Sequence, residues 1–282
     1  MKARTFGLPV LLVLVLLGSA PVFGADATLQ AAAPDSQAAG PVAQTARQPL
    51  DIMLVIDNSC SMFPADRRIP GCEVWGNDPD FLRITGASLF IARLGFAQPD
   101  AADYQVGVVS LGEDPPVLVS PLQSLATGRD ALAAAISDPQ PALATQLLPA
   151  LELAYRELRE SPQRRPGNSP AIVLLTDGAP YPAEGQSNAE IEQFVASYPD
   201  VPLFVILLQN PEQANVNYER YVSFWQEMAL RHSYIQSYPV GSTAEIEATY
   251  DEIVARLENS VARPPIALTP GQAVEVFVSR YV

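Results

Sequence analysis

Apolar residues recur along the chain in two patterns that predict alternating strands and helices. Nearly continuous apolar runs are typical of strands buried on both faces of a sheet, and residues spaced by three and four indicate amphipathic helices. Their alternation predicts an α/β fold: a three-layer, Rossmann-like, doubly wound and mostly parallel sheet with helices on both faces. The predicted strands are 50–57, 104–111, 116–120, 170–176, 202–208 and the less apolar 234–238, and the predicted helices are 79–95, 148–160, 217–231 and 244–260.

Two of these helices have recognisable start signals. Asp78 is suited to cap the helix at 79–95, with Pro79 in the first helical position. Ser242 and Glu245 have the spacing of a capping box at the start of the last helix.

The segments outside the predicted domain differ from it in composition. Residues 1–24 place Lys2 and Arg4 before a short apolar core and small residues, which predicts a secretory signal peptide, although an uncleaved anchor stays open. Residues 25–48 are rich in Ala, Gln and Pro and predict a disordered linker. The folded domain is expected at 49–262.

The C-terminal segment, 263–282, contains valines at alternate positions. Val274, Val276 and Val278 alternate with polar residues, as in a half-buried strand. Such a strand either joins an edge of the domain or begins a further β-rich module.

Oxygen-bearing side chains follow two of the predicted strands and precede one helix. Asp57, Ser59 and Ser61 come at and after the end of the first strand, Asp177 follows 170–176, and Thr145 precedes 148–160. Ligands bind at the carboxyl edge of open α/β sheets. Hydroxyls and carboxylates form the all-oxygen shells that hard divalent cations prefer, and a shell with one open position suits Mg²⁺.

The ordered set resembles the metal-ion-dependent adhesion site of the von Willebrand factor A domain family. The resemblance covers about 49 to 262 and rests on Asp57-x-Ser59-x-Ser61, on Thr145, and on Thr176-Asp177-Gly178 at a strand end. It implies that the two serines and the threonine bind Mg²⁺ or Mn²⁺ directly, and that the two aspartates act directly or through water. An acidic side chain of a protein partner would fill the remaining position. The family often has Gly-Gly before the threonine, where this chain has Leu143-Ala144.

The two cysteines fall on either side of a short loop beside the motif. Cys60 and Cys72 are the only cysteines, and a secretory signal implies an oxidising compartment, so we expect a disulfide; a pair of free thiols is the alternative. The insertion, 62–78, that separates the motif from its helix also contains Arg67, Arg68 and Trp75. Arg and Trp are enriched at protein interfaces, so this insertion could contact a partner. An ordinary solvated loop is an equally good interpretation.

Catalysis finds little support in the sequence. His232 is the only histidine, and no sharp nucleophile elbow accompanies it, as a serine triad would require. A phosphatase with Asp57 as nucleophile would want a second acid where Ser59 stands, and no obvious base serves metal-activated hydrolysis. We therefore expect a protein that is not an enzyme.

Net charge narrows the class of partner. The formal charge is −14, and removal of Lys2 and Arg4 with the signal makes it −16, which disfavours nucleic acid and anionic lipid. We expect a secreted or cell-surface protein, with no membrane insertion after signal cleavage, that binds a partner's Asp or Glu through the cation. The alternative is a structural or assembly component whose site binds an acid of its own longer chain or complex.

Overall fold

The computed structural model describes residues 49–73, 75–96, 104–113, 115–137, 139–178, 187–210 and 218–257. The predictions for the signal peptide, the linker and the C-terminal segment lie outside these residues.

The described residues form a six-stranded, mostly parallel sheet. Its order is β3-β2-β1-β4-β5-β6, in which β3 runs antiparallel to β2 and every other neighbouring pair is parallel. The predicted doubly wound α/β class is confirmed. The strands are β1 (Leu50–Asp57), β2 (Gln105–Leu111), β3 (Val117–Ser124), β4 (Ser169–Thr176), β5 (Leu203–Leu208) and β6 (Ile235–Val240).

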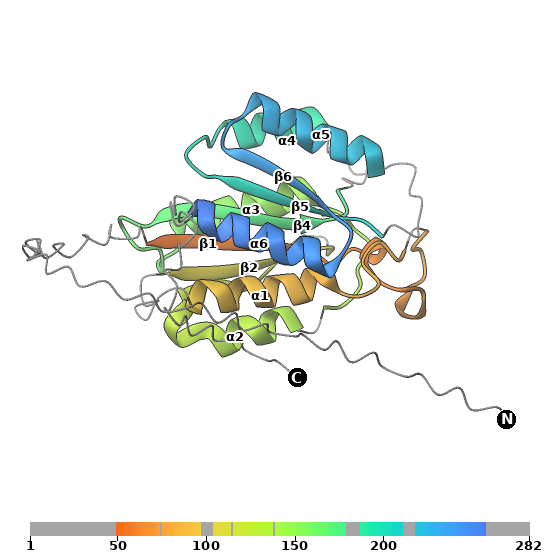
Figure 1. Cartoon of the computed structure of the whole chain (residues 1–282), viewed down its shortest axis with the longest axis horizontal. Coiled ribbons are helices and arrows are strands. Elements are labelled where there is room, and N and C mark those ends of the chain that lie inside the picture. Colours follow the sequence, from red (N-terminus) through yellow and green to blue (C-terminus); the bar gives the residue numbers. More distant parts are fainter. Residues whose placement is uncertain are drawn as a thin grey trace, which may run out of the picture. The chain divides into compact units, whose positions relative to one another are not determined.

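Three helices cover each face of the sheet (Figure 1). Side chains of β1 alternate between the layers, so Ile52 and Leu54 pack on one side and Met53 and Val55 on the other. Every residue of β1 is buried, which explains its unbroken apolar run. The first layer is α1 (Leu82–Phe96), α2 (Leu125–Ser137) and α6 (Thr243–Leu257), and the second is α3 (Leu147–Glu160), α4 (Asn188–Ala196) and α5 (Tyr218–Arg231).

Strand pairing brings the ends of β1 and β4 to one level. Ile56 pairs with Leu175, and Asp57 pairs with Leu111 at the end of β2. Residues that directly follow β1 and β4 are therefore neighbours at the carboxyl edge of the sheet.

The outer strands differ from the inner ones. The pairing of β3 with β2 shifts register twice, between Val106 and Val109, and β3 contains Pro121. The opposite outer strand, β6, contains Pro239.

One predicted helix start is wrong, because α1 begins at Leu82 and Pro79 lies outside it. Asp78 is nevertheless its cap: its carboxylate accepts hydrogen bonds from the backbone N–H groups of Leu82 (2.6 Å) and Arg83 (3.1 Å). The chain between has Phe81 at φ 53°, a turn conformation that a helix starting at Pro79 could not contain.

The last helix has only half of the predicted capping box. Ser242 accepts a hydrogen bond from the N–H of Glu245 (3.3 Å), but the Glu245 carboxylate accepts one from Gly241 instead of Ser242.

The sequence interpretation also missed α2 and α4. Helix α4 has a complete capping box between Ser187 and Glu190.

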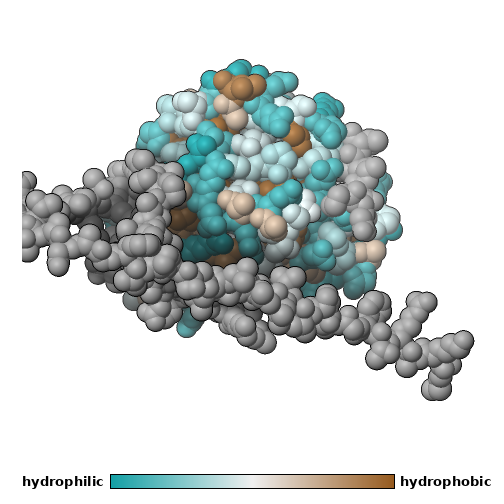
Figure 2. All heavy atoms as spheres, viewed as in Figure 1, coloured by the Kyte–Doolittle hydropathy of each residue, from teal (hydrophilic) through white to brown (hydrophobic). Residues whose placement is uncertain are grey.

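The surface gives no sign of a membrane-spanning element in the part of the chain that the structure covers. None of its helices is both long enough and apolar enough to cross a membrane. The face in Figure 2 is mostly hydrophilic, with small and separate hydrophobic patches.

We predict that Gly86→Ala destabilises the domain by about 1–3 kcal/mol, because overpacking forces helices apart. A Cβ at position 86 would lie 2.5 Å from Cδ1 of Ile246 and 2.7 Å from Cε2 of Tyr250, where α1 packs against α6. Gly128→Ala in α2 is the matched control, because the atoms nearest to the new methyl belong to the flexible side chain of Gln123. Denaturant unfolding measures both variants, and an equal or smaller loss for Gly86→Ala would contradict this close contact.

Candidate metal-binding site

Asp57 ends β1 in a buried position and has both carboxylate oxygens hydrogen-bonded. Oδ1 accepts a hydrogen bond from the backbone N–H of Ser59 (2.8 Å), and Oδ2 accepts one from the hydroxyl of Thr176 (2.6 Å). The Thr176 hydroxyl accepts in turn from the N–H of Gly178 (3.0 Å). The ends of β1 and β4 are therefore tied together through the Asp57 side chain.

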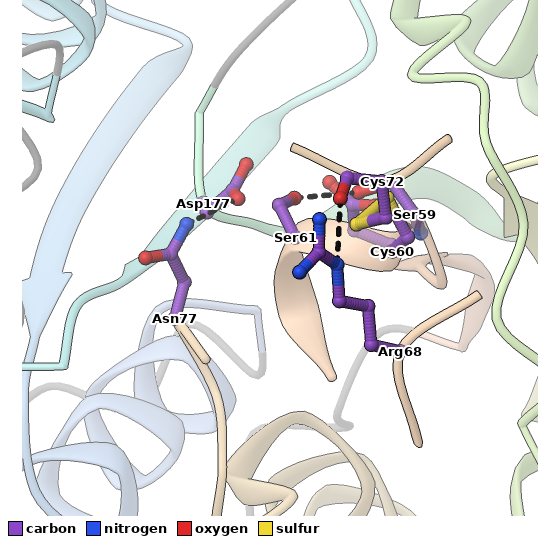
Figure 3. The surroundings of a disulfide bond; sticks show 8 residues. Ser59, Cys60, Ser61, Arg68, Cys72, Asn77 and Asp177 are labelled. Atoms are coloured by element: carbon purple, nitrogen blue, oxygen red, sulfur yellow. Dashed lines mark hydrogen bonds between the residues drawn. A yellow bond between two sulfur atoms is a disulfide. The ribbon is translucent and has the colours of Figure 1, made fainter. Parts of the chain in front are cut away.

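The chain turns sharply after Asp57, and this turn brings two serines together. Residues Cys60–Met62 form one turn of 3-10 helix, and the hydroxyl oxygens of Ser59 and Ser61 lie 3.0 Å apart. Figure 3 shows both serines beside Asp177 and the disulfide. Ser59 is buried, whereas Ser61 is partly exposed.

Gly112 allows the β1 loop to lie close to the end of β2. Its φ is +138°, and a Cβ there would lie 2.6 Å from the carbonyl carbon of Asn58. A larger residue would displace the loop that holds Ser59.

The loop that contains Thr145 pairs with the first motif through backbone hydrogen bonds. Cys60 donates to the carbonyl of Ala142 (2.7 Å), Ala142 donates to Asn58 (3.0 Å), and Ala144 donates to Gly112 (3.0 Å). This pairing holds the loop although Leu143-Ala144 stands where the resembled family often has two glycines. Thr145 follows directly and is largely buried.

Asp177 follows β4 and is oriented by a residue that sequence reasoning missed. The side-chain amide of Asn77 donates to Oδ2 of Asp177 (2.8 Å), and both residues are buried. Asn77 also donates its backbone N–H to the carbonyl of Ser61 (3.0 Å). Its position at the end of an insertion gave no sequence signal, because only the folded loop brings it to β4.

The predicted disulfide between Cys60 and Cys72 is present, and both cysteines are buried or nearly so. It ties the insertion to the first motif. Arg68 strengthens the loop, since its Nε donates to the carbonyl of Cys72 (2.9 Å; Figure 3). Its guanidinium also lies 4.0 Å from the ring centroid of Trp75.

Arg83 anchors the other end of the insertion from inside the protein. It is fully buried, forms an ion pair with Asp78 (2.7 Å), and donates from Nε to Oδ1 of Asn58 (3.2 Å). Its guanidinium also lies 4.5 Å from the ring centroid of Phe63. Because Asn58 lies between Asp57 and Ser59, this buried pair braces the first motif from behind. Arg83 was missed because a charged residue on a predicted helix is ordinarily solvated.

The two site carboxylates oppose each other electrostatically. Burial first, and then the charge of Asp177, raise the pKa of Asp57 from 3.8 to about 7, although hydrogen bonds from Ser59 and Thr176 lower it. A bound cation would relieve this repulsion. In the described ranges no cluster of three His, Cys, Asp or Glu side chains occurs, so a metal here needs the serine and threonine hydroxyls as ligands.

The lone histidine lies at the opposite end of the parallel strands, where they begin. His232 follows α5 just before β6 begins, and its Nε2 is 3.2 Å from the carboxylate of Glu192. The site lies where strands β1 and β4 end, so His232 does not belong to it.

The family match agrees with the fold. Residues 52–179 match the model of the von Willebrand factor type A domain, and the sheet and helices of the described residues form a VWA-like α/β fold. Comparison with curated proteins finds no match.

Solved structures with this fold include proteins of bacterial pili. They are the PilB minor pilin of Streptococcus sanguinis (13% identity, TM-score 0.54), the pilus adhesin SpaC of Lactobacillus rhamnosus GG (18%, 0.54) and the vWF domain of the type V pili tip protein Mfa5 of Porphyromonas gingivalis (12%, 0.54). Each match covers 76–78% of this chain. It spans 62% of the PilB chain and 31% of the SpaC chain, against 98% of the Mfa5 domain. At these identities the likeness shows the fold alone.

We predict that in chelator the stability of the domain has a component that falls as pH rises from about 4 to about 7. In this window the unfolded Asp57 loses its proton while the buried folded carboxyl keeps it. The folded state then binds more protons, so rising pH favours unfolding. Asp57→Asn should flatten this dependence in denaturant unfolding, and Asp200→Asn on the opposite edge should not. Equal slopes for wild type and Asp57→Asn would show that Asp57 titrates alike in both states.

Proposed function

We propose that this VWA domain binds Mg²⁺ or Mn²⁺ at Asp57, Ser59, Ser61, Thr145 and Asp177, and through it an acidic side chain of a protein partner. The observation that carries the proposal is the pair of serine hydroxyls 3.0 Å apart beside two buried carboxylates at one sheet edge. These groups fit a hard cation, because every candidate ligand is an oxygen and the two carboxylates need a compensating charge.

Each residue has a definite task in this proposal. Ser59, Ser61 and Thr145 offer neutral hydroxyl oxygens, and Asp57 holds the two strand ends together while it supplies charge. The cation supplies a positive centre with a position that a partner's carboxylate can occupy. Two carboxylates do not cancel more than the charge of one divalent ion, so an incoming anion is not repelled by excess negative charge at the site.

Such a contact explains how a strongly acidic chain could hold an acidic ligand. The net charge of −14 opposes the approach of another acidic surface over long distances. A cation held by these residues would attract a carboxylate at short range.

Binding fits the described site better than catalysis does. The only histidine of the sequence lies at the opposite edge of the sheet, and the hydroxyls of Ser59 and Ser61 hydrogen-bond to each other.

The disulfide and the fold neighbours support a place outside the cytoplasm. Disulfides persist in oxidising compartments, and an N-terminal signal peptide is predicted at 1–24. Three of the fold neighbours are a minor pilin, a pilus adhesin and a pilus tip protein. We therefore propose a secreted or cell-surface adhesive role for this chain.

We predict that calorimetric titration with Mg²⁺ detects one site, that Asp177→Ala abolishes it, and that Ser59→Ala weakens it less. Removing a charged ligand costs more than removing a neutral one, because the remaining carboxylate then compensates the cation alone. Asp200→Ala is the control, since this exposed acid pairs with Arg159 far from the motif. Undiminished heat in Asp177→Ala would refute the assignment.

We predict that a partner recovered by pull-down from the native cell envelope binds in Mg²⁺, dissociates in chelator and returns when Mg²⁺ is restored. Changing the partner's key Asp or Glu to Asn or Gln should abolish binding, because the amide lacks the charge that the cation attracts. Full binding in chelator would contradict a metal-mediated contact. A chelator effect confined to self-association or stability would favour the assembly role instead.

A further inference from the structure

We infer that Asn77 is a specificity-determining residue of the site, which orients Asp177 so that it favours Mg²⁺ over Ca²⁺. The inference rests on the proposed metal function. It concerns a residue of the disulfide-bonded insertion, outside the five-residue motif.

Asn77 connects the two halves of the site. Its side-chain Nδ2 donates to Oδ2 of Asp177 at 2.8 Å, and its backbone N–H donates to the carbonyl of Ser61 at 3.0 Å. One residue thus spans from the loop after β1 to the loop after β4. Only 6% of Asn77 is exposed, so water competes little for the bond to Asp177.

The insertion fixes Asn77 from both sides. Next to it, Gly76 donates its N–H to the carbonyl of Phe63 (2.7 Å), and its own carbonyl accepts from the side chain of Asn210 (2.9 Å). On the other side, Asp78 forms the buried ion pair with Arg83. The Cys60–Cys72 disulfide holds the middle of the same loop (Figure 3). The Asn77 amide is therefore a rigidly mounted donor.

An amide donor at this place limits how Asp177 can meet a cation. A metal that took both carboxylate oxygens would have to approach Oδ2 against the amide protons of Asn77. Binding through Oδ1 alone, directly or through water, avoids that repulsion. Asn77 therefore favours a single-oxygen contact.

The preference for one oxygen discriminates between cations. Mg²⁺ demands a compact octahedron and is usually held by single carboxylate oxygens and water, whereas Ca²⁺ takes six to eight oxygens and readily accepts a bidentate carboxylate. Holding Asp177 to one oxygen thus lowers the coordination number that the site can offer. Partners that orient a metal ligand typically contribute about 10–100-fold in metal affinity.

The test is calorimetric titration of the full chain with Mg²⁺ and separately with Ca²⁺, for wild type, Asn77→Ala and Asn77→Ser. Alanine removes the donor, and serine keeps a small polar group too short to replace it. Both variants keep the backbone N–H that bonds Ser61. We expect the Mg²⁺ dissociation constant to rise about 10–100-fold, with a smaller change or a gain for Ca²⁺, so that the Mg²⁺/Ca²⁺ preference falls.

Asn210→Ala is the matched control. It removes a side-chain amide that bonds the same loop at the carbonyl of Gly76, next to Asn77. If the loss of affinity came only from a more flexible insertion, Asn210→Ala would lose Mg²⁺ affinity as Asn77→Ala does. We expect Asn210→Ala to keep the Mg²⁺ affinity and the Mg²⁺/Ca²⁺ preference of the wild type. Thermal unfolding in chelator shows which variants are folded. If Asn77→Ala does not fold, Asn77→Ser takes its place in the titrations.

Two failures are distinguishable. Wild type without Mg²⁺ binding would refute the proposed function itself. Wild type that binds Mg²⁺, together with a folded Asn77 variant of unchanged affinity and unchanged Mg²⁺/Ca²⁺ preference, would overturn only the role of Asn77. Equal loss for both ions, matched by Asn210→Ala, would reduce Asn77 to a purely structural residue.

Discussion

Two carboxylates are buried at the same sheet edge, and the electrostatic cost of that arrangement governs the structure around them. Asp57 and Asp177 lie close together because β1 and β4 pair in parallel, so that the two strands end at the same level. Burial raises the pKa of Asp57, and the nearby charge of Asp177 raises it further. Hydrogen-bond donors lower this electrostatic cost: Ser59 and Thr176 each donate to one carboxylate oxygen of Asp57, and Asn77 donates to one of Asp177.

The insertion acts as a second layer of support for this edge. Its two anchors are of different kinds: a covalent bond at Cys60–Cys72, and a buried ion pair at Asp78–Arg83. An ion pair in the interior repays its desolvation only when the geometry is good and the remaining donors find acceptors. Arg83 meets that condition in part through Asn58 and through its stacking on Phe63. In return for this desolvation cost, the Asp78–Arg83 ion pair fixes Asn58 and with it the first motif.

The sequence predicted those elements and motifs that depend on hydrophobic periodicity and on the order of neighbouring residues. Strand β1 and its following Asp57-x-Ser59-x-Ser61 were readable because a doubly buried strand leaves a continuous apolar run. Helix α2 was missed although Leu125, Leu132 and Ile136 line its buried face, because alanine-rich segments give a weak contrast between faces. Asn77 could not be predicted, since its role depends on a contact with Asp177, 100 residues away in the sequence. The five site positions stay predictions as metal ligands.

The prolines of the outer strands bear on how this domain can associate. An edge strand with a full row of N–H and C=O groups is a template for another strand, and proline removes a donor from that row. Pro121 in β3 and Pro239 in β6 interrupt both edges, and the register shifts of β3 distort one of them further. Neither side of the sheet offers an uninterrupted template for aggregation or for growth by strand addition.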